Sequence, residues 1–288
     1  MIVIKVSDER VENLQVAPEN RPGISQRLFT TMKNPLSLSS SWATKAARNN
    51  AEWCDLVCRT HGVLGEFCQH SWINRNETPP FYPNLVTLDE SKSTQQYETI
   101  RELVEMDIPV EWTVKDSFGT LNLSSDGFRE LLNGEWIRWP ASSKMPEAYT
   151  SGVRWAKVVD RKELTQWERG WRGTAAESQP LFLPALIEDE RIIIVGAFRE
   201  DAVVAGCIGN RSEDVVGISN IFGPDQRAKE FRSGCVAAIL GWSKGLPLVG
   251  YESGLDLVAM NSLGFETVGQ LKVWVRSISS SQTVNPLR

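Results

Sequence analysis

The sequence predicts an α+β protein with a mixed sheet, organised as two packed domains. Its 288 residues are enough for two domains of ordinary size, each with its own core. In the second half, short apolar runs of strand length alternate with segments of helical periodicity, in the order β-α-β-β-β-α-β-α-β. Residues 140–151, which precede this half, are rich in proline and serine and are typical of a linker between domains.

The first half predicts an irregular arm and then an α+β domain over 41–145. Residues 1–40 are polar and interrupted by prolines, so we expect an arm with one short strand over 2–6. The domain begins with a helix over 41–61, which a serine caps and Gly62 ends. The three prolines within residues 79–83 predict a stiff extended segment, because each fixes its own φ. Strands are also expected over 85–88, 110–114 and 135–139, and helices over 93–106 and 128–132.

The second half predicts a domain over 152–277, followed by a flexible tail over 278–288. Apolar alternation and β-branched runs predict strands over 153–158, 192–198, 203–210, 215–222, 248–251 and 270–275. Helical spacing of apolar residues predicts helices over 161–171, 230–242 and 255–263.

Composition limits the compartment and the partners. No apolar run approaches the roughly 18 residues of a membrane helix, and the N-terminus lacks the layout of a signal peptide, so a cytoplasmic protein without a membrane partner is expected. Five cysteines without framework spacing suit a reducing compartment. A net charge of -5 argues against a large sequence-independent nucleic-acid surface. The 11 tryptophans predict heavy aromatic packing.

One C-terminal phrase carries a family resemblance. A helix closed by Leu263-Gly264-Phe265 and followed by a short alternating strand resembles the C-terminal half of the GNAT acyltransferase superfamily. The phrases at 53–58, 80–83 and 114–118 look like those of GNAT proteins with an extra N-terminal half, and this resemblance implies that the half is a degenerate second copy of the fold. The resemblance implies that the strands over 215–222 and 248–251 run parallel and diverge at their C-terminal ends, where an acyl donor enters.

The same resemblance implies a set of donor-binding residues. In GNAT enzymes a glycine-rich loop before a helix grips the pyrophosphate of acetyl-CoA, because backbone N–H groups must approach the phosphates closely. Here the loop after Gly223-Pro224 contains no further glycine before Gly234, and Glu230 would repel a phosphate. Either charged side chains of this loop bind the pyrophosphate in place of the backbone amides, or the loop no longer binds it. The implied donor-binding residues are Ser219, Asn220, Ile221, Phe222, Arg227, Lys229, Arg232 and Ser253.

The proton donor that the resemblance implies is also altered. Many GNAT enzymes carry a tyrosine on the last helix that protonates the leaving thiolate, but Met260 occupies the corresponding position here. Tyr251, at the end of the preceding strand and beside Glu252, is the nearest replacement, and we take these two as the catalytic candidates. The structural alternative is that Tyr251 packs under the helix and Glu252 is solvated.

Two further groups of residues are open to a functional or a structural interpretation. Three cysteines and both histidines lie close together in the sequence and could bind zinc, but the spacing is not that of a zinc finger, so core packing is favoured and no metal is expected. The group consists of Cys54, Cys58, His61, Cys68 and His70. Lys115 and Asp116 point to opposite faces of a strand end. A local turn is favoured there, although one of them could reach a cleft between the halves.

The expected function is transfer of an acyl group, from acetyl-CoA or another acyl thioester, to an amine of a small molecule or peptide. Two alternatives remain open. Tandem GNAT-like ligases of the Fem type lack the phosphate loop and take an aminoacyl group from tRNA, which needs a basic docking face. A catalytically inert binding module is the other alternative, since both the phosphate loop and the usual tyrosine are altered. The oligomeric state and the acceptor are not specified by these patterns.

Overall fold

The computed structural model of the protein describes residues 35–140, 143–146, 152–173 and 179–277. The strands within these ranges are β1 (Glu66–Phe67), β2 (Ser71–Ile73), β3 (Leu85–Thr87), β4 (Trp112–Asp116), β5 (Arg129–Arg138), β6 (Arg154–Lys157), β7 (Ile192–Arg199), β8 (Ala202–Arg211), β9 (Val216–Phe222), β10 (Leu248–Glu252) and β11 (Glu266–Arg276). The α-helices are α1 (Pro35–Thr60), α2 (Ser93–Glu105), α3 (Arg161–Arg172), α4 (Ala185–Glu188), α5 (Ala228–Trp242) and α6 (Gly254–Leu263).

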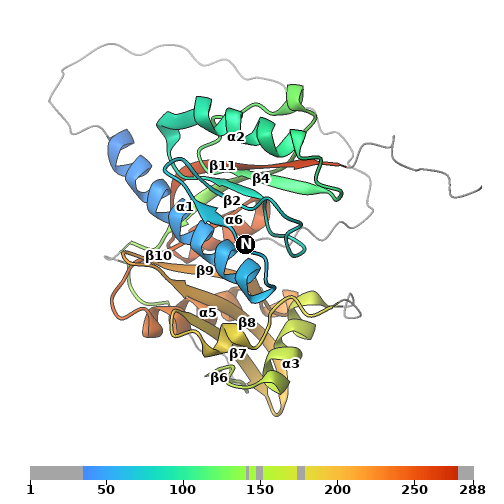
Figure 1. The fold of residues 1–288 in the computed structure, drawn as a ribbon. Coiled ribbons are helices and arrows are strands. Elements are labelled where there is room, and N and C mark those ends of the chain that lie inside the picture. Colours follow the sequence, from blue (N-terminus) through green and yellow to red (C-terminus); the bar gives the residue numbers. More distant parts are fainter. Residues whose placement is uncertain (1–34, 141–142, 147–151, 174–178, 278–288) are drawn as a thin grey trace, which may run out of the picture.

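One mixed sheet connects all eleven described strands. Its order is β1-β2-β3-β4-β11-β5-β10-β9-β8-β7-β6. Two neighbouring pairs are parallel, β3 with β4 and β9 with β10, and the other pairs are antiparallel. The long helix α1 crosses the middle of the sheet and contacts strands from both halves of the chain (Figure 1). The expected α+β class with a mixed sheet is confirmed.

The two halves of the chain exchange their last strands. Each half contains a parallel pair joined by a helix, β3-α2-β4 in the first and β9-α5-β10 in the second. β5 follows β4 along the chain but lies between β10 and β11, and β11 follows β10 and α6 but lies between β4 and β5. This arrangement has the symmetry expected of two related halves. The division into domains at residues 146–151 stays a prediction, since strands of both ranges interleave in one sheet.

The middle of the sheet packs closely against α1. Small side chains form the buried stripe of the helix, among them Ala43, Ala46 and Ala47. A Cβ atom added to Gly217 of β9 would lie 2.1 Å from Oδ1 of Asn49, so only glycine allows the helix to approach β9 this closely. The tryptophans act as core anchors, as expected, and the most deeply buried are Trp53, Trp72, Trp136 and Trp167.

Three expectations about the first half are wrong. The segment over 79–83, expected to be extended, contains a turn in which the N–H of Tyr82 donates to the carbonyl oxygen of Pro79 at 3.1 Å. The helix expected from residue 41 begins six residues earlier, at Pro35, so part of the expected arm is helical. Proline fits the first turn of a helix because its missing N–H has no partner there in any case. The helix expected over 128–132 is instead the start of β5, which pairs with β11 across its whole length. Pairing with a strand distant in the sequence overrides local helical spacing.

The other predicted elements lie close to their expected positions, whereas β1, β2 and α4 were not predicted. β4 begins two residues later than predicted, and the expected third strand over 135–139 is the second part of β5. β6 to β11 and α3, α5 and α6 match the predicted strands and helices of the second half. The strand expected over 2–6, part of the linker over 140–151 and the tail over 278–288 lie outside the described residues.

Candidate active site

The parallel strands β9 and β10 separate at their C-terminal ends. They pair only at Leu248 with Val216 and at Val249 with Gly217. Beyond these pairs, β9 continues along β8 and β10 continues along β5. A Cβ atom at Gly250 would lie 2.9 Å from the carbonyl oxygen of Ile218, so glycine permits the last close contact before the strands part. The predicted parallel pairing and divergence are confirmed.

A bulge in β9 places unpartnered polar atoms at this opening. The pairing with β8 shifts between Ser219, opposite Ile208, and Phe222, opposite Gly206. Within the bulge Asn220 has a φ of 54°, which few residues other than glycine and asparagine adopt readily. Its side chain is fully buried, and neither its Nδ2 nor its Oδ1 has a hydrogen-bond partner among the described residues; the same holds for Oγ of Ser219. Buried polar groups of this kind normally have partners, so the site is suited to a ligand amide.

The remaining residues of β9 have mainly packing roles. Ile221 packs half-buried against the core beneath α5 and α6. Phe222 contacts Trp167 of α3 edge to face, with ring centroids 5.1 Å apart. These two side chains line the end of β9 without offering polar groups, so the polar chemistry of the strand is confined to Ser219 and Asn220.

The loop that leads into α5 carries less free positive charge than the sequence suggests. Arg227 forms an ion pair with Glu230 at 2.6 Å, which raises the pKa of the arginine and lowers the pKa of the glutamate. Arg232 is paired with Asp256 of α6. Lys229 is exposed. Glu230 therefore neutralises a neighbouring cation, and the two arginines would have to exchange partners to bind a phosphate.

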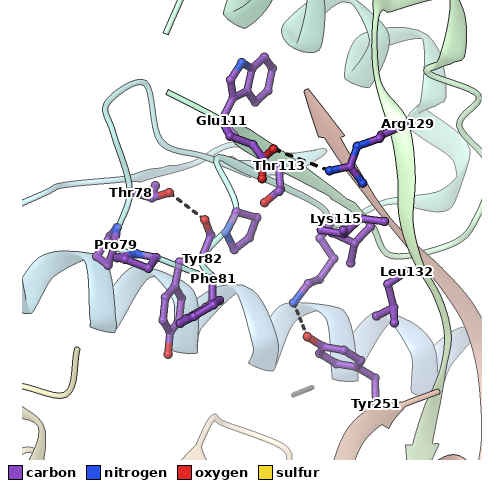
Figure 2. A pocket seen from close by; sticks show the side chains of 15 residues that line it. Thr78, Pro79, Phe81, Tyr82, Glu111, Thr113, Lys115, Arg129, Leu132 and Tyr251 are labelled. Carbon is purple, nitrogen blue, oxygen red and sulfur yellow. Dashed lines mark hydrogen bonds and ion pairs between the residues drawn. The ribbon is translucent and has the colours of Figure 1, made fainter. Parts of the chain in front are cut away.

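Tyr251 belongs to a buried polar cluster drawn from three elements. Nζ of Lys115 on β4 donates to the hydroxyl of Tyr251 on β10 at 3.2 Å (Figure 2). It also donates to Oδ1 of Asn50 on α1 at 2.8 Å. Lys115 and Tyr251 are only 3% and 5% exposed. Trp136 packs edge-on against the Tyr251 ring, with centroids 5.4 Å apart. Burial raises the pKa of Tyr251 well above its usual value and lowers the pKa of Lys115.

Lys115 and Asp116 have different roles in the structure. The turn that the sequence favours at this strand end is present, and the carboxylate of Asp116 accepts from the backbone N–H groups of Phe118 and Leu121. Lys115 instead takes the alternative role of reaching between the halves. The signal in the sequence is the alternation of the strand, which places Lys115 on the face opposite to Asp116.

Tyr251 and Glu252 have different surroundings, although the charge of Glu252 contributes to the raised pKa of Tyr251. Tyr251 packs in the core beneath α1, whereas the charges that act on Glu252 include Asp256 of α6 and Arg232 of α5. Adjacent residues of a strand point to opposite faces, which explains the separation. Glu252 is also buried rather than solvated, and burial raises its pKa.

The last helix contributes little polar chemistry of its own. Ser253 is the N-cap residue of α6, but its side chain makes no capping hydrogen bond. Met260, at the position that the resemblance assigns to a tyrosine, is buried in the core beneath α5 and α6. The proton-donor role therefore has no candidate on α6.

The cysteines and histidines are dispersed. Cys54 and Cys58 are fully buried in the core beneath α1, and burial raises the pKa of Cys54 to about 11. Nε2 of His61 lies 2.8 Å from the carbonyl oxygen of Leu181. Cys68 and His70 contact each other in the connection between β1 and β2. Within the described ranges no three His, Cys, Asp or Glu side chains group in a way that could hold a metal ion.

A pocket of about 350 Å³ opens over the Lys115–Tyr251 contact. Its lining comes from the segment 78–83, from β4, β5 and β11, and from Tyr251 (Figure 2). A second void, of about 10 Å³, is bordered by Asn50, Ser219 and Tyr251. It has about the size of one water molecule. Tyr251 thus lines both the larger pocket and the void beside Ser219 of β9.

Comparisons with solved structures identify the fold. A GCN5-related N-acetyltransferase from Kribbella flavida matches with a TM-score of 0.54 and 14% identity, over 80% of this chain and 95% of that one. A conserved protein of unknown function from Staphylococcus epidermidis matches with a TM-score of 0.50 and 10% identity, over 73% and 85% of the two chains. No protein-family model matches the sequence, and neither does any curated protein.

The chain therefore has the GNAT superfamily fold, as the C-terminal phrase suggested. At such low identity the likeness concerns the fold and leaves the reaction to be argued from the site. No helix within the described residues is long and apolar enough to cross a membrane.

Proposed function

We propose that the protein is an N-acyltransferase that moves an acyl group from acetyl-CoA or another acyl thioester to an amine of a small molecule or peptide. The observation that carries the proposal is the Asn220 amide in the opening between β9 and β10, for which the described part of the chain offers no hydrogen-bond partner. A pantetheine arm carries amides that can donate to its Oδ1 and accept from its Nδ2. The donor arm would then enter between two strands that the sheet already holds apart.

Tyr251 is the proposed acid of the reaction. When the amine attacks the thioester carbonyl carbon and the C–S bond breaks, the thiolate takes the phenol proton, and the proton lost by the amine returns to the phenolate. Since Lys115 donates to the phenol oxygen, the phenol proton remains available for the thiolate. The raised pKa of Tyr251 keeps the phenol protonated at neutral pH. Lys115 in its charged form would stabilise the phenolate, and Asn50 holds the lysine in place.

The proposed donor fits the strands better than it fits the loop. Asn220 and Ser219 suit the pantetheine amides, but no glycine-rich turn precedes α5, and Arg227 and Arg232 are paired with carboxylates. Lys229 is the cation of the loop for which no ion pair is found within the described residues. We therefore expect the pyrophosphate to contribute less to affinity than the pantetheine arm does. Ser253 is proposed to border the donor at the start of α6.

Calorimetry with matched ligands tests the proposal. Acetyl-CoA, free CoA and S-acetylpantetheine should all bind, and removal of the nucleotide should weaken binding by about tenfold or less, because few free charges face it. Asn220→Gly should weaken all three, since glycine keeps the positive φ and removes only the amide. Absence of binding at millimolar ligand would end the thioester proposal. Salt-dependent binding of tRNA would then favour an aminoacyl-tRNA donor, and no binding of either would favour an inert module.

A further inference from the structure

We infer that the pocket over Lys115 is a binding site for the carboxylate of a small amphipathic acid. The pocket has the size of a small-molecule site, about 350 Å³, and its walls are mainly apolar. The lining side chains that matter for recognition are Phe81, Lys115, Leu132, Tyr251 and Val273. Figure 2 shows the ammonium group of Lys115 and the hydroxyl of Tyr251 pointing toward each other at its inner end.

The first argument is the charge of Lys115. Its described hydrogen bonds go to two neutral oxygens, of Asn50 and Tyr251, which leaves one of its three N–H donors without an acceptor. Within the described residues it forms no ion pair with a carboxylate, although its side chain is almost fully buried. A buried ammonium without a counter-charge is unfavourable, so an anion that enters the pocket supplies the missing partner.

The second argument is the shape and stiffness of the apolar wall. The segment 79–83 forms a turn, in which the N–H of Tyr82 donates to the carbonyl oxygen of Pro79 at 3.1 Å. Its prolines fix their own φ, and Phe81 has a φ of 73°, which is rare for an aromatic residue. The Phe81 ring is 49% exposed and contacts Trp171 of α3 edge to face at 6.2 Å. Leu132 of β5 and Val273 of β11 form the opposite wall. A preformed apolar wall suits the hydrocarbon part of the acid.

The entrance is polar and balanced in charge. Glu111 and Arg129 form an ion pair there at 3.7 Å, and both side chains are more than half exposed. They discriminate little between charges, so recognition of the anion falls to the inner end of the pocket. Together these features specify an acid with a compact apolar body and one carboxylate head.

Protonation of Lys115 supplies a second readout. Burial lowers its pKa, and a bound carboxylate favours the charged form, so binding should take up a proton wherever the free lysine is partly neutral. Several other polar groups face this ammonium or the pocket. They are the Asn50 amide and the Cys54 thiol of α1, the phenols of Tyr82 and Tyr251, and the charged side chains of Glu111 and Arg129 at the entrance.

The inference concerns binding alone and does not require the proposed transfer reaction. If that reaction takes place, the acid in this pocket is the acceptor, with its amine directed toward Tyr251 from the α1 face. The experiment therefore uses the full chain without any thioester, so that its failure and the failure of donor binding are separate results.

Three ligands with the same apolar body and different heads test the inference: phenylacetate, phenylacetamide and 2-phenylethylamine. Titration followed by NMR should show phenylacetate binding about tenfold or more tightly than the other two. Lys115→Met should remove this preference and keep the fold, because methionine fills similar space without a charge. The matched control is Lys272→Met, at a half-buried lysine paired with Glu130 outside the pocket, which should leave the preference unchanged.

Calorimetry in two buffers of different ionisation enthalpy should show proton uptake with phenylacetate, and this uptake should be lost in the Lys115→Met variant. Equal binding of the three ligands by the wild-type protein would overturn the inference. So would a carboxylate preference that survives in the Lys115→Met variant. Absence of binding for all three at millimolar concentration would overturn it as well.

Discussion

Lys115 and Tyr251 meet at 3.2 Å although they lie 136 residues apart in the chain and on strands that are not neighbours. β11 and β5 lie between β4 and β10, so three inter-strand steps, roughly 14 Å, separate the two backbones. Both side chains reach over these central strands beneath α1. The exchange of strands between the halves thus creates the contact, and neither half alone contains the cluster.

The first prediction concerns proton donation. Tyr251→Phe should lower kcat by about 100-fold or more while leaving donor affinity unchanged, because only the phenol proton is lost. Steady-state kinetics and calorimetry with acetyl-CoA measure the two effects. Tyr97→Phe, at a tyrosine whose hydroxyl contacts Asn122 away from the cleft, is the matched control and should retain full turnover. Equal activity of the Tyr251 variant and the wild type would remove Tyr251 from the mechanism.

The second prediction concerns the loop before α5. Lys229→Ala should weaken binding of CoA by about tenfold or less, and Glu230→Gln should strengthen it a few-fold, because it frees Arg227 from its ion pair. Both effects should shrink as ionic strength rises, since these groups are exposed. S-acetylpantetheine, which lacks the phosphates, should bind both variants like the wild type. A weaker CoA complex for Glu230→Gln would show that the Arg227–Glu230 pair organises the loop.

The third prediction separates function from stability at Asn220. Its buried amide has no partner among the described residues, and its backbone has a positive φ. Asn220→Gly should leave the melting temperature unchanged or raise it, because an unsatisfied amide is removed and glycine tolerates this φ. Donor affinity should fall in the same variant. Thermal denaturation and calorimetry on one preparation test both; a variant that is less stable yet binds normally would contradict the assignment.

Much of this fold can be predicted from the sequence, and the reasons are local. β7 to β10, α3 and α5 carry clear periodicity and turn signals, so their positions follow from short windows. β5 could not be predicted in this way: its first residues, 129–132, have helical spacing, and only their pairing with β11 makes them a strand. The exchange of β5 and β11 between the halves also depends on pairing between strands that are distant in the sequence. No single segment of the sequence therefore predicts it.

The site is predictable only in part. The sequence makes Ser219 and Asn220 candidates because they interrupt an apolar strand, and Tyr251 a candidate because it is the nearest replacement for the missing tyrosine of the last helix. It does not show that Glu252 faces away from Tyr251. Tyr251 accepts a hydrogen bond from Lys115, and this contact reaches over the two strands β11 and β5 that lie between them. Likewise, the ion pairs of Arg227 and Arg232 depend on helix packing, so counting basic residues overestimates the free charge of the loop.

The fourth prediction concerns metal. Cys54 and Cys58 lie in the core, so chelator should leave the melting temperature unchanged and elemental analysis should show less than one zinc per chain. A structural zinc site contributes a large share of the folding free energy and would make the protein sensitive to chelator. Stoichiometric zinc that is released only on unfolding would contradict this expectation.

The last prediction concerns the pH dependence of stability at Lys115. Burial lowers its pKa in the folded protein below the unfolded value of 10.5. Between these two pKa values the unfolded chain binds more protons, so the contribution of Lys115 to the free energy of unfolding rises with pH and is lost as pH falls through the folded pKa.

Lys115→Met should remove this contribution. The buried thiol of Cys54 acts in the opposite direction, because its pKa is raised to about 11 and the folded state holds the proton longer. Denaturation curves of wild type and variant must therefore be subtracted at each pH. The difference should favour the wild type increasingly as pH rises toward 10.5. A difference independent of pH from 6 to 10, as a rough working range, would show that the pKa of Lys115 is not lowered.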